Sequence, residues 1–256
     1  MSVRLISPLS VWEAEREPWE RIDDLQFRGR YLLQDTREFC FGMDAVLLAR
    51  FAHFHQGARV LDLGTGTGII PLLLADEAHS VLAVEENPRM VHLARRNVQL
   101  NGLAEQIQVV NGDVKNFRRL YPAESFDVAL MNPPYYSQGN GKQNLQSGKA
   151  QARHEITATL VDFLQAARWG LRFGGRLFLV HVPTRIDEIL IALQACQFSV
   201  HRLRLVYPMQ KKEACLVLLE ASVGKALGHI KILSPLFVRE ETGNYTAEIL
   251  QLYHRE

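Results

Sequence analysis

From residue 58 onward, short apolar runs alternate with segments whose apolar residues recur every three or four positions. The apolar runs indicate buried strands, and the wider spacing is typical of amphipathic helices. The predicted strands are Arg59–Leu63, Ser80–Glu85, Ile107–Val110, Phe126–Met131, Arg176–Val182, Phe198–Val206 and Ala214–Glu220. The predicted helices are Ile69–Ala75, a segment from Pro88 to the terminator Asn101-Gly102, a segment from Leu160 to the terminator Gly174-Gly175, and Ile186–Gln194.

The connections between these elements predict the fold class. A helix between two strands returns the chain to the same edge of the sheet, so such strands are expected to be parallel. Tyr207–Lys212 joins the last two strands without room for a helix, so these two are expected to pair antiparallel. The pattern therefore predicts an α/β fold, a doubly wound and mostly parallel seven-stranded sheet with helices on both faces.

The N-terminal part shows no such alternation. Residues 1–21 mix charges with scattered aromatic side chains and are expected to form an irregular arm. Asp24–Gln34 alternates around a glycine like a short hairpin, and Ala45–Phe51 reads as a helix with Asp44 as its N-cap. We expect residues 1–50 to pack as arm, hairpin and helix on a main domain of residues 51–256, within one globular unit.

Composition narrows the class of protein. Of 256 residues, 47% are hydrophobic, which is enough for a sizeable core, and 29 basic residues balance 28 acidic ones, so no global positive field is expected. The three cysteines are isolated, which disfavours a disulfide framework or a structural zinc site. No signal peptide and no run of about 18 apolar residues is found. A cytoplasmic protein without membrane or metal association is expected.

The first chemical signal is the turn Asp62-Leu63-Gly64-Thr65-Gly66-Thr67-Gly68, which follows the first strand of the alternating region. Glycines at alternate positions let a backbone turn sharply and approach a ligand closely. The dinucleotide fingerprint is G-x-G-x-x-G, so this G-x-G-x-G pattern makes a pyrophosphate cradle the weaker interpretation. A plain strand-to-helix turn is the alternative.

Two acids end the next two predicted strands. Glu85 closes the second strand, where a carboxylate can accept hydrogen bonds from both hydroxyls of a ribose. Asp113 follows the third strand, where an acid can accept from the exocyclic amine of an adenine, or serve only as a turn residue.

The fourth strand ends in Asn132-Pro133-Pro134-Tyr135, and two prolines terminate a strand abruptly. This stiff turn would hold a carboxamide and an aromatic ring at the carboxyl end of a strand, where open α/β sheets bind ligands. An exocyclic amine conjugated to a ring is a poor nucleophile. It would keep electron density on nitrogen if the Asn132 side-chain oxygen and the Pro133 carbonyl accept its hydrogens, while Tyr135 stacks on the planar acceptor. A purely structural strand terminator is the alternative.

Together, the glycine turn, Glu85, Asp113 and the strand order resemble the class I S-adenosylmethionine-dependent methyltransferases, whose strand order is 3-2-1-4-5-7-6. Asn132-Pro133-Pro134-Tyr135 resembles the amino-methylating branch of that family. The resemblance implies S-adenosylmethionine as cofactor and residues 51–256 as the methyltransferase domain. It implies catalytic roles for Asn132, Pro133, Pro134 and Tyr135, and cofactor contacts from Asp44, Asp62, Gly64, Thr65, Gly66, Gly68, Glu85, Asp113 and Asn132.

A closer resemblance covers most of the chain after Asp24. Its motifs are Gln34, Phe39-x-Phe41-Gly42-x-Asp44, Ala152-Arg153-His154-Glu155, Gly139-Asn140-Gly141, Asn144, Lys212-Glu213-Ala214 and Gly243-Asn244-Tyr245-Thr246. They look like those of the bacterial tRNA(Val) adenine N6-methyltransferases, which modify the adenine at position 37, immediately 3′ of the anticodon. The resemblance implies tRNA as partner and places Asp44 at the methionine end of the cofactor. The phosphate-contact candidates are Arg28, Arg30, Lys142, Lys149, Arg153, Lys211 and Lys212.

Other interpretations fit the same motifs. A glutamine N5-methyltransferase acting on a protein would use the same Asn132-Pro133-Pro134-Tyr135 for a planar amide, and another RNA or DNA amine is equally compatible with it. A non-enzymatic RNA-binding or scaffold protein of the same fold is the third interpretation, disfavoured by the intact glycine turn, Glu85, Asp113 and Asn132. His154-Glu155 lacks the second histidine of a zinc helix, and His181 is expected to be a structural histidine.

Overall fold

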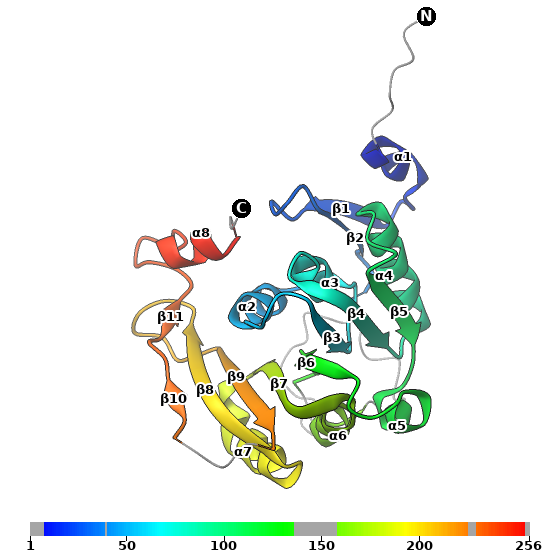
Figure 1. Ribbon diagram of the computed structural model, residues 1–256. Coiled ribbons are helices and arrows are strands. Elements are labelled where there is room, and N and C mark those ends of the chain that lie inside the picture. The colour runs from blue at the N-terminus through cyan, green and yellow to red at the C-terminus, as the bar shows by residue number, and fades with distance from the viewer. Residues whose placement is uncertain (1–7, 39, 136–157, 225–228, 254–256) are drawn as a thin grey trace, which may run out of the picture.

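A computed structural model describes residues 8–38, 40–135, 158–224 and 229–253 (Figure 1). Its helices are α1 (Pro8–Glu15), α2 (Met43–Phe51), α3 (Ile69–Leu74), α4 (Pro88–Leu100), α5 (Phe117–Leu120), α6 (Leu160–Gly170), α7 (Ile186–Ala195) and α8 (Ala247–Tyr253), with short 3₁₀ turns η1 (Val114–Asn116) and η2 (Pro183–Arg185). Its strands are β1 (Glu20–Asp24), β2 (Tyr31–Asp35), β3 (Ala58–Leu63), β4 (Ala78–Glu85), β5 (Ile107–Asn111), β6 (Phe126–Met131), β7 (Leu171–His181), β8 (Phe198–Tyr207), β9 (Leu216–Val223), β10 (Lys231–Ile232) and β11 (Leu236–Phe237).

The central sheet has the predicted order. It runs β10-β8-β9-β7-β6-β3-β4-β5, with β11 also paired to β8. The strands β3 to β7 are parallel to one another, and β9 is antiparallel to both β7 and β8. The seven predicted strands therefore lie in the order 3-2-1-4-5-7-6 with the last one antiparallel, and the two short strands β10 and β11 extend the sheet beyond β8.

Helices cover both faces of the sheet, as Figure 1 shows. Alternate residues of β3 face opposite layers: Val60 joins the apolar core under α2, α3 and α4, whereas Leu61 and Leu63 join the core under α5, α6 and α7. All three side chains are fully buried. This double burial explains why the strands read as continuous apolar runs rather than as alternating ones.

The N-terminal part differs from the expectation. The expected irregular arm contains helix α1, and the first hairpin strand is Glu20–Asp24, earlier than predicted. Leu25 and Phe27 lie instead in the hairpin loop, because Gln26 and Arg28 both adopt φ of 51° and reverse the chain. The side chain of Phe27 is nevertheless buried, which is why it belonged to the apolar pattern.

The predicted end of the helix before β7 is also wrong. Helix α6 ends at Gly170, and Gly174-Gly175 lies inside β7. Leu171 already pairs with Phe126 of β6 and is fully buried, so the sheet captures the chain before the glycine pair is reached. Gly175 is required there for another reason: a Cβ at this position would lie 2.8 Å from the carbonyl oxygen of Arg172.

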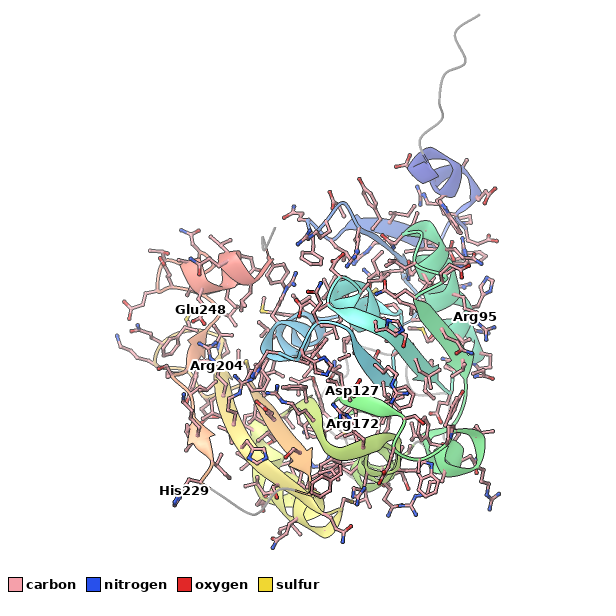
Figure 2. All side chains as sticks on the ribbon, in the orientation of Figure 1. Arg95, Asp127, Arg172, Arg204, His229 and Glu248 are labelled. Carbon is pink, nitrogen blue, oxygen red and sulfur yellow. The ribbon has the colours of Figure 1, made fainter. Side chains whose placement is uncertain are left out.

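No element is predicted after residue 220, yet the C-terminal segment is ordered against the sheet edge and α2. Helix α8 packs on α2, and an ion pair of 2.7 Å joins Arg204 of β8 to Glu248 of α8 (Figure 2). Within the described ranges, the structure has no helix long and apolar enough to span a bilayer.

Candidate active site

The carboxyl ends of β4, β3 and β6 meet at one edge of the sheet. Leu63 of β3 pairs with Val84 of β4 on one side and with Met131 of β6 on the other. The turn after each strand therefore starts at the same level. This register brings the glycine turn, Glu85 and Asn132 together, although they lie 70 residues apart in sequence at most.

The glycine turn adopts a conformation that only glycine accepts easily. Gly64, Gly66 and Gly68 have φ values of 74°, 56° and 83°. A Cβ on Gly64 would also lie 3.0 Å from the ring of Phe163, so the turn is tightly backed by α6. The backbone N–H groups of Gly64 and Thr65 both donate to the Val84 carbonyl, at 2.9 and 3.0 Å, which fixes the turn against the end of β4.

Glu85 is tied to the same turn. Its Oε2 accepts from the Gly66 N–H at 3.0 Å, and its Oε1 accepts from the Asn87 N–H at 2.9 Å. Each carboxylate oxygen has a further acceptor site, so a ligand hydroxyl can still bind. Asp113 serves as a turn residue: its Oδ1 accepts from the Lys115 N–H at 2.9 Å and caps η1.

Asp62 is the exceptional group of this turn. It is fully buried at the end of β3, and neither carboxylate oxygen has a hydrogen-bond partner in the described structure. Burial raises its pKa from 3.8 to about 7; the nearby Thr65 hydroxyl opposes this shift and the charge of Glu85 adds to it. A buried carboxylate without a donor is costly, which indicates a site built to receive a donor from a ligand.

Asn132, Tyr135 and Asp44 form a hydrogen-bonded triangle at the end of β6. The Asn132 Nδ2 donates to Asp44 Oδ2 at 3.0 Å, and the Tyr135 hydroxyl lies 2.6 Å from the same oxygen and 2.9 Å from Asn132 Oδ1. The strand stops at Met131 as predicted, with Pro133 buried behind the turn and Pro134 exposed. The structure thus joins the sequence motif to a residue 88 positions earlier.

His181 and Arg185 also contact Tyr135, and the sequence motifs assign neither of them to the site. The His181 ring lies 5.1 Å from the Tyr135 ring, between centroids, and Arg185 donates to the Tyr135 carbonyl at 3.0 Å. The Val182 N–H donates to His181 Nδ1, so the ring hydrogen is on Nε2, which is buried and has no partner among the described residues. Burial lowers the pKa of His181, which keeps it neutral. The sequence signal that could have revealed it is its position at the end of β7, the strand that pairs with β6.

The C-terminal helix reaches the same region. Burial raises the pKa of Tyr253 in α8 to about 12, and the charge of Asp44 adds to this shift. Tyr253 is therefore close enough to Asp44 to feel its charge.

Some expected residues lie elsewhere. Arg28 lines a cleft with Asp76 and Glu77, just before β4 begins, and is thus at the opposite edge of the sheet. Arg30 is buried and forms an ion pair of 2.7 Å with Asp76. Lys211 is exposed and pairs with Glu241. The following expected residues lie outside the described residues: Phe39, Gly139-Asn140-Gly141, Lys142, Asn144, Lys149 and Ala152-Arg153-His154-Glu155.

The described residues contain no group of three or more His, Cys, Asp or Glu side chains placed to hold a metal ion.

The fold and the glycine turn define a Rossmann-like methyltransferase. A family model described as the methyltransferase small domain matches residues 42–191, more than half of the chain, and this range contains both the glycine turn and Asn132-Pro133-Pro134-Tyr135. The chain belongs to the methyltransferase small domain family.

Among similar proteins is the tRNA1(Val) (adenine(37)-N6)-methyltransferase of Photorhabdus laumondii, 30% identical over 237 residues, which are 91% of this chain and 94% of that protein. The protein of the same name from Histophilus somni strain 129Pt is 32% identical over 160 residues, 61% of this chain and 66% of the relative. A crystal structure described as a predicted O-methyltransferase from Agrobacterium tumefaciens superimposes with a TM-score of 0.67, at 25% identity, over 82% of this chain and 95% of that one.

Proposed function

We propose that this protein transfers the methyl group of S-adenosylmethionine to the N6 amine of an adenine in RNA, with adenine 37 of a valine tRNA as the substrate. The observation that carries the proposal is the Asn132 carboxamide, held at a strand end beside the glycine turn. The names of the two relatives described above support the choice of tRNA and of position 37.

The residues of the glycine turn suit S-adenosylmethionine. The positive φ values of Gly64, Gly66 and Gly68 give the turn a path that lets its backbone approach a ligand closely. The Asp62 carboxylate, which has no hydrogen-bond partner among the described residues, suits the ammonium group of the methionine end, and Thr65 lies beside it. Glu85 would accept from the ribose hydroxyls, and Asp113 from the adenine amine of the cofactor. When bound, the cofactor supplies an electrophilic methyl group on a sulfonium.

The chain's own residues prepare the acceptor amine. The Asn132 Oδ1 and the Pro133 carbonyl would accept the two hydrogens of the adenine N6, so that the nitrogen keeps its electron density as it attacks. The stiff turn of Pro133 and Pro134 holds both oxygens in place, which favours a near-attack arrangement. The Tyr135 ring would stack on the adenine, a contact of about 1–3 kcal/mol for a base on an aromatic side chain.

The test is tritium transfer from labelled S-adenosylmethionine into an unmodified valine tRNA transcript. We expect the wild-type protein to label this transcript and not one with guanosine at position 37. Asn132→Ala should lower the rate about 100-fold or more, as for loss of one preorganised group at a reacting centre. The control is Gln56→Ala, an exposed position before β3 at the opposite edge of the sheet, which should leave the rate unchanged.

Two outcomes would contradict the proposal. Equal labelling by Asn132→Ala would remove this side chain from the mechanism. Label recovered in a protein fraction, and not in RNA, would instead support glutamine N5 methylation, because a planar amide suits the same oxygens.

A further inference from the structure

Asp44 joins the first turn of α2 to the end of β6 through one carboxylate. It lies in the first turn of α2, where its Oδ1 accepts from the Ala45 N–H at 2.9 Å. Its other oxygen, Oδ2, accepts from Asn132 Nδ2 at 3.0 Å and faces the Tyr135 hydroxyl at 2.6 Å. The carboxylate is thus held by its own helix and spans to the end of β6.

The segment before Asp44 is fixed by a buried side chain. Gln34 of β2 is fully buried, and its Oε1 accepts from the Phe41 N–H at 3.0 Å. Its Nε2 donates to Asp23 of β1. The hairpin therefore holds the chain three residues before Asp44, which favours a single position for the carboxylate.

A carboxamide needs such a neighbour because its two ends are alike in shape and opposite in hydrogen bonding. Rotation of the Asn132 side chain by about 180° would exchange an acceptor for a donor and present N–H groups to the substrate amine. A carboxylate can only accept hydrogen bonds, so Asp44 admits only the orientation with Nδ2 toward itself. The Asn132 Oδ1 then points away from Asp44, toward the Tyr135 hydroxyl.

We propose that Asp44 is a positioning residue for methyl transfer, which fixes the Asn132 carboxamide so that Oδ1 is available to the acceptor amine. This inference rests on the proposed function and assigns Asp44 a role in the chemical step, in place of the cofactor contact that the sequence resemblance implies. The charge of Asp44 also polarises the carboxamide, which makes Oδ1 a stronger acceptor in a site of low dielectric constant.

The Tyr135 hydroxyl fits this role of Asp44. Burial, with the charge of Asp44 as the next cause, raises the pKa of Tyr135, so the hydroxyl keeps its hydrogen. That single hydrogen is shared between Asp44 Oδ2 and Asn132 Oδ1. When a substrate amine takes Asn132 Oδ1, Asp44 still accepts the phenolic hydrogen, and no buried donor loses its partner.

A double-mutant cycle tests the inference. Asp44→Ala, Asn132→Ala and the double variant are compared for kcat on tRNA at saturating cofactor, and for S-adenosylhomocysteine affinity by calorimetry. We expect Asp44→Ala to lower kcat about 10- to 100-fold, the range for a lost hydrogen bond to a charged group, with affinity changed less than about threefold. In the Asn132→Ala background, Asp44→Ala should lower kcat less than about twofold further. Multiplicative effects on kcat, or a loss confined to affinity, would overturn the inference.

An exchanged pair provides a second variant if Asp44→Ala fails to fold. Asn132→Asp places two carboxylates together and should be nearly inactive. Adding Asp44→Asn restores a donor and an acceptor with reversed polarity. The double variant should have a kcat at least about tenfold higher than that of Asn132→Asp alone. No recovery in the exchanged pair would contradict the positioning role. Glu38→Gln, an acid on the hairpin side of α2 that pairs with Arg89, is the matched control and should leave kcat unchanged.

A substrate-free measurement separates this inference from the proposed function. In protein labelled with ¹⁵N-asparagine, the Asn132 Nδ2 hydrogens should exchange with water at least about tenfold faster in Asp44→Ala than in wild type. Wild-type protein that shows slow exchange and methylates no tRNA would refute the substrate assignment alone. Equal exchange in both proteins, with tRNA methylation intact, would refute the positioning role alone.

Discussion

The carboxamide of Asn97 in α4 is hydrogen-bonded to both backbone polar groups of Leu33 in β2. Its Oδ1 accepts from the Leu33 N–H at 2.6 Å and its Nδ2 donates to the Leu33 carbonyl at 2.9 Å. The same Nδ2 donates to the Thr67 carbonyl in the glycine turn at 2.9 Å. Asn101, one helical turn later, pairs in the same way with Tyr31. Helix α4 thus takes the place of a neighbouring strand for β2 and ties the hairpin to the glycine turn.

Replacing Asn97 should therefore cost much more than replacing a surface asparagine. Asn97→Ala leaves the Leu33 N–H and two carbonyls buried without partners, which we expect to lower the free energy of unfolding by about 3 kcal/mol. Asn101→Ala, at a half-buried position, should lower it by about 1 kcal/mol. Urea unfolding of both variants measures the difference, and equal losses would contradict this account.

Gly64→Ala should disturb the turn through both its backbone and its contact with α6. The positive φ costs about 1–2 kcal/mol for a residue with a side chain, and the added Cβ would press on Phe163. Gly29→Ala is the matched control, since its φ is 64° and a Cβ there would meet nothing within 4 Å. We expect S-adenosylhomocysteine affinity, measured by calorimetry, to fall at least tenfold in Gly64→Ala only. Normal affinity in that variant would show that the turn adapts.

Asp62→Asn should stabilise the protein in the absence of cofactor. The pKa of Asp62 is raised to about 7 by burial, so the folded state binds the proton more tightly than the unfolded state. The stabilisation of wild type by the protonated Asp62 carboxyl is fully present below about pH 4 and is lost as the pH rises through about 7. At pH 8 the variant should exceed wild type by about 4 kcal/mol in free energy of unfolding, and at pH 4 the two should be nearly equal.

The control for this prediction is a carboxylate with partners. Asp127 accepts from the Arg59 N–H at 2.7 Å and forms an ion pair of 2.6 Å with Arg172; Asp127 and Arg172 are labelled in Figure 2. Asp127→Asn should lower stability at pH 8, opposite in sign to Asp62→Asn. Stabilisation by both substitutions would point to a general effect of removing negative charge.

Glu220→Gln should destabilise the antiparallel edge of the sheet. The Glu220 carboxylate in β9 is buried between Arg176 of β7 and Arg202 of β8, with an Arg202 Nε to Oε2 distance of 2.6 Å. Removing the anion leaves two guanidinium groups facing each other, which should lower the free energy of unfolding by about 2–4 kcal/mol. Glu241→Gln, whose exposed pair with Lys211 is screened by water, should show no measurable change in urea unfolding.

Much of the fold follows from local patterns. The apolar runs predict seven strands of the central sheet within a few residues, because strands buried on both faces must be apolar throughout. The boundaries that failed were those that tertiary pairing sets. Leu171 leaves α6 because Phe126 pairs with it, and the short strands β10 and β11 exist only as additions to β8. Two-residue strands carry too little pattern to be found in a sequence.

For the site, the sequence by itself determined the chemical groups: a glycine turn, acids at strand ends, and a carboxamide fixed by prolines. These signals are local, since each lies where one strand ends and one turn begins. Only the tertiary structure decided that Asp44 accepts a hydrogen bond from the Asn132 carboxamide, that Asp62 has no donor among the described residues and that His181 lies against Tyr135. Such relations depend on the register between parallel strands and on the packing of α2 across them, and no local spacing encodes either.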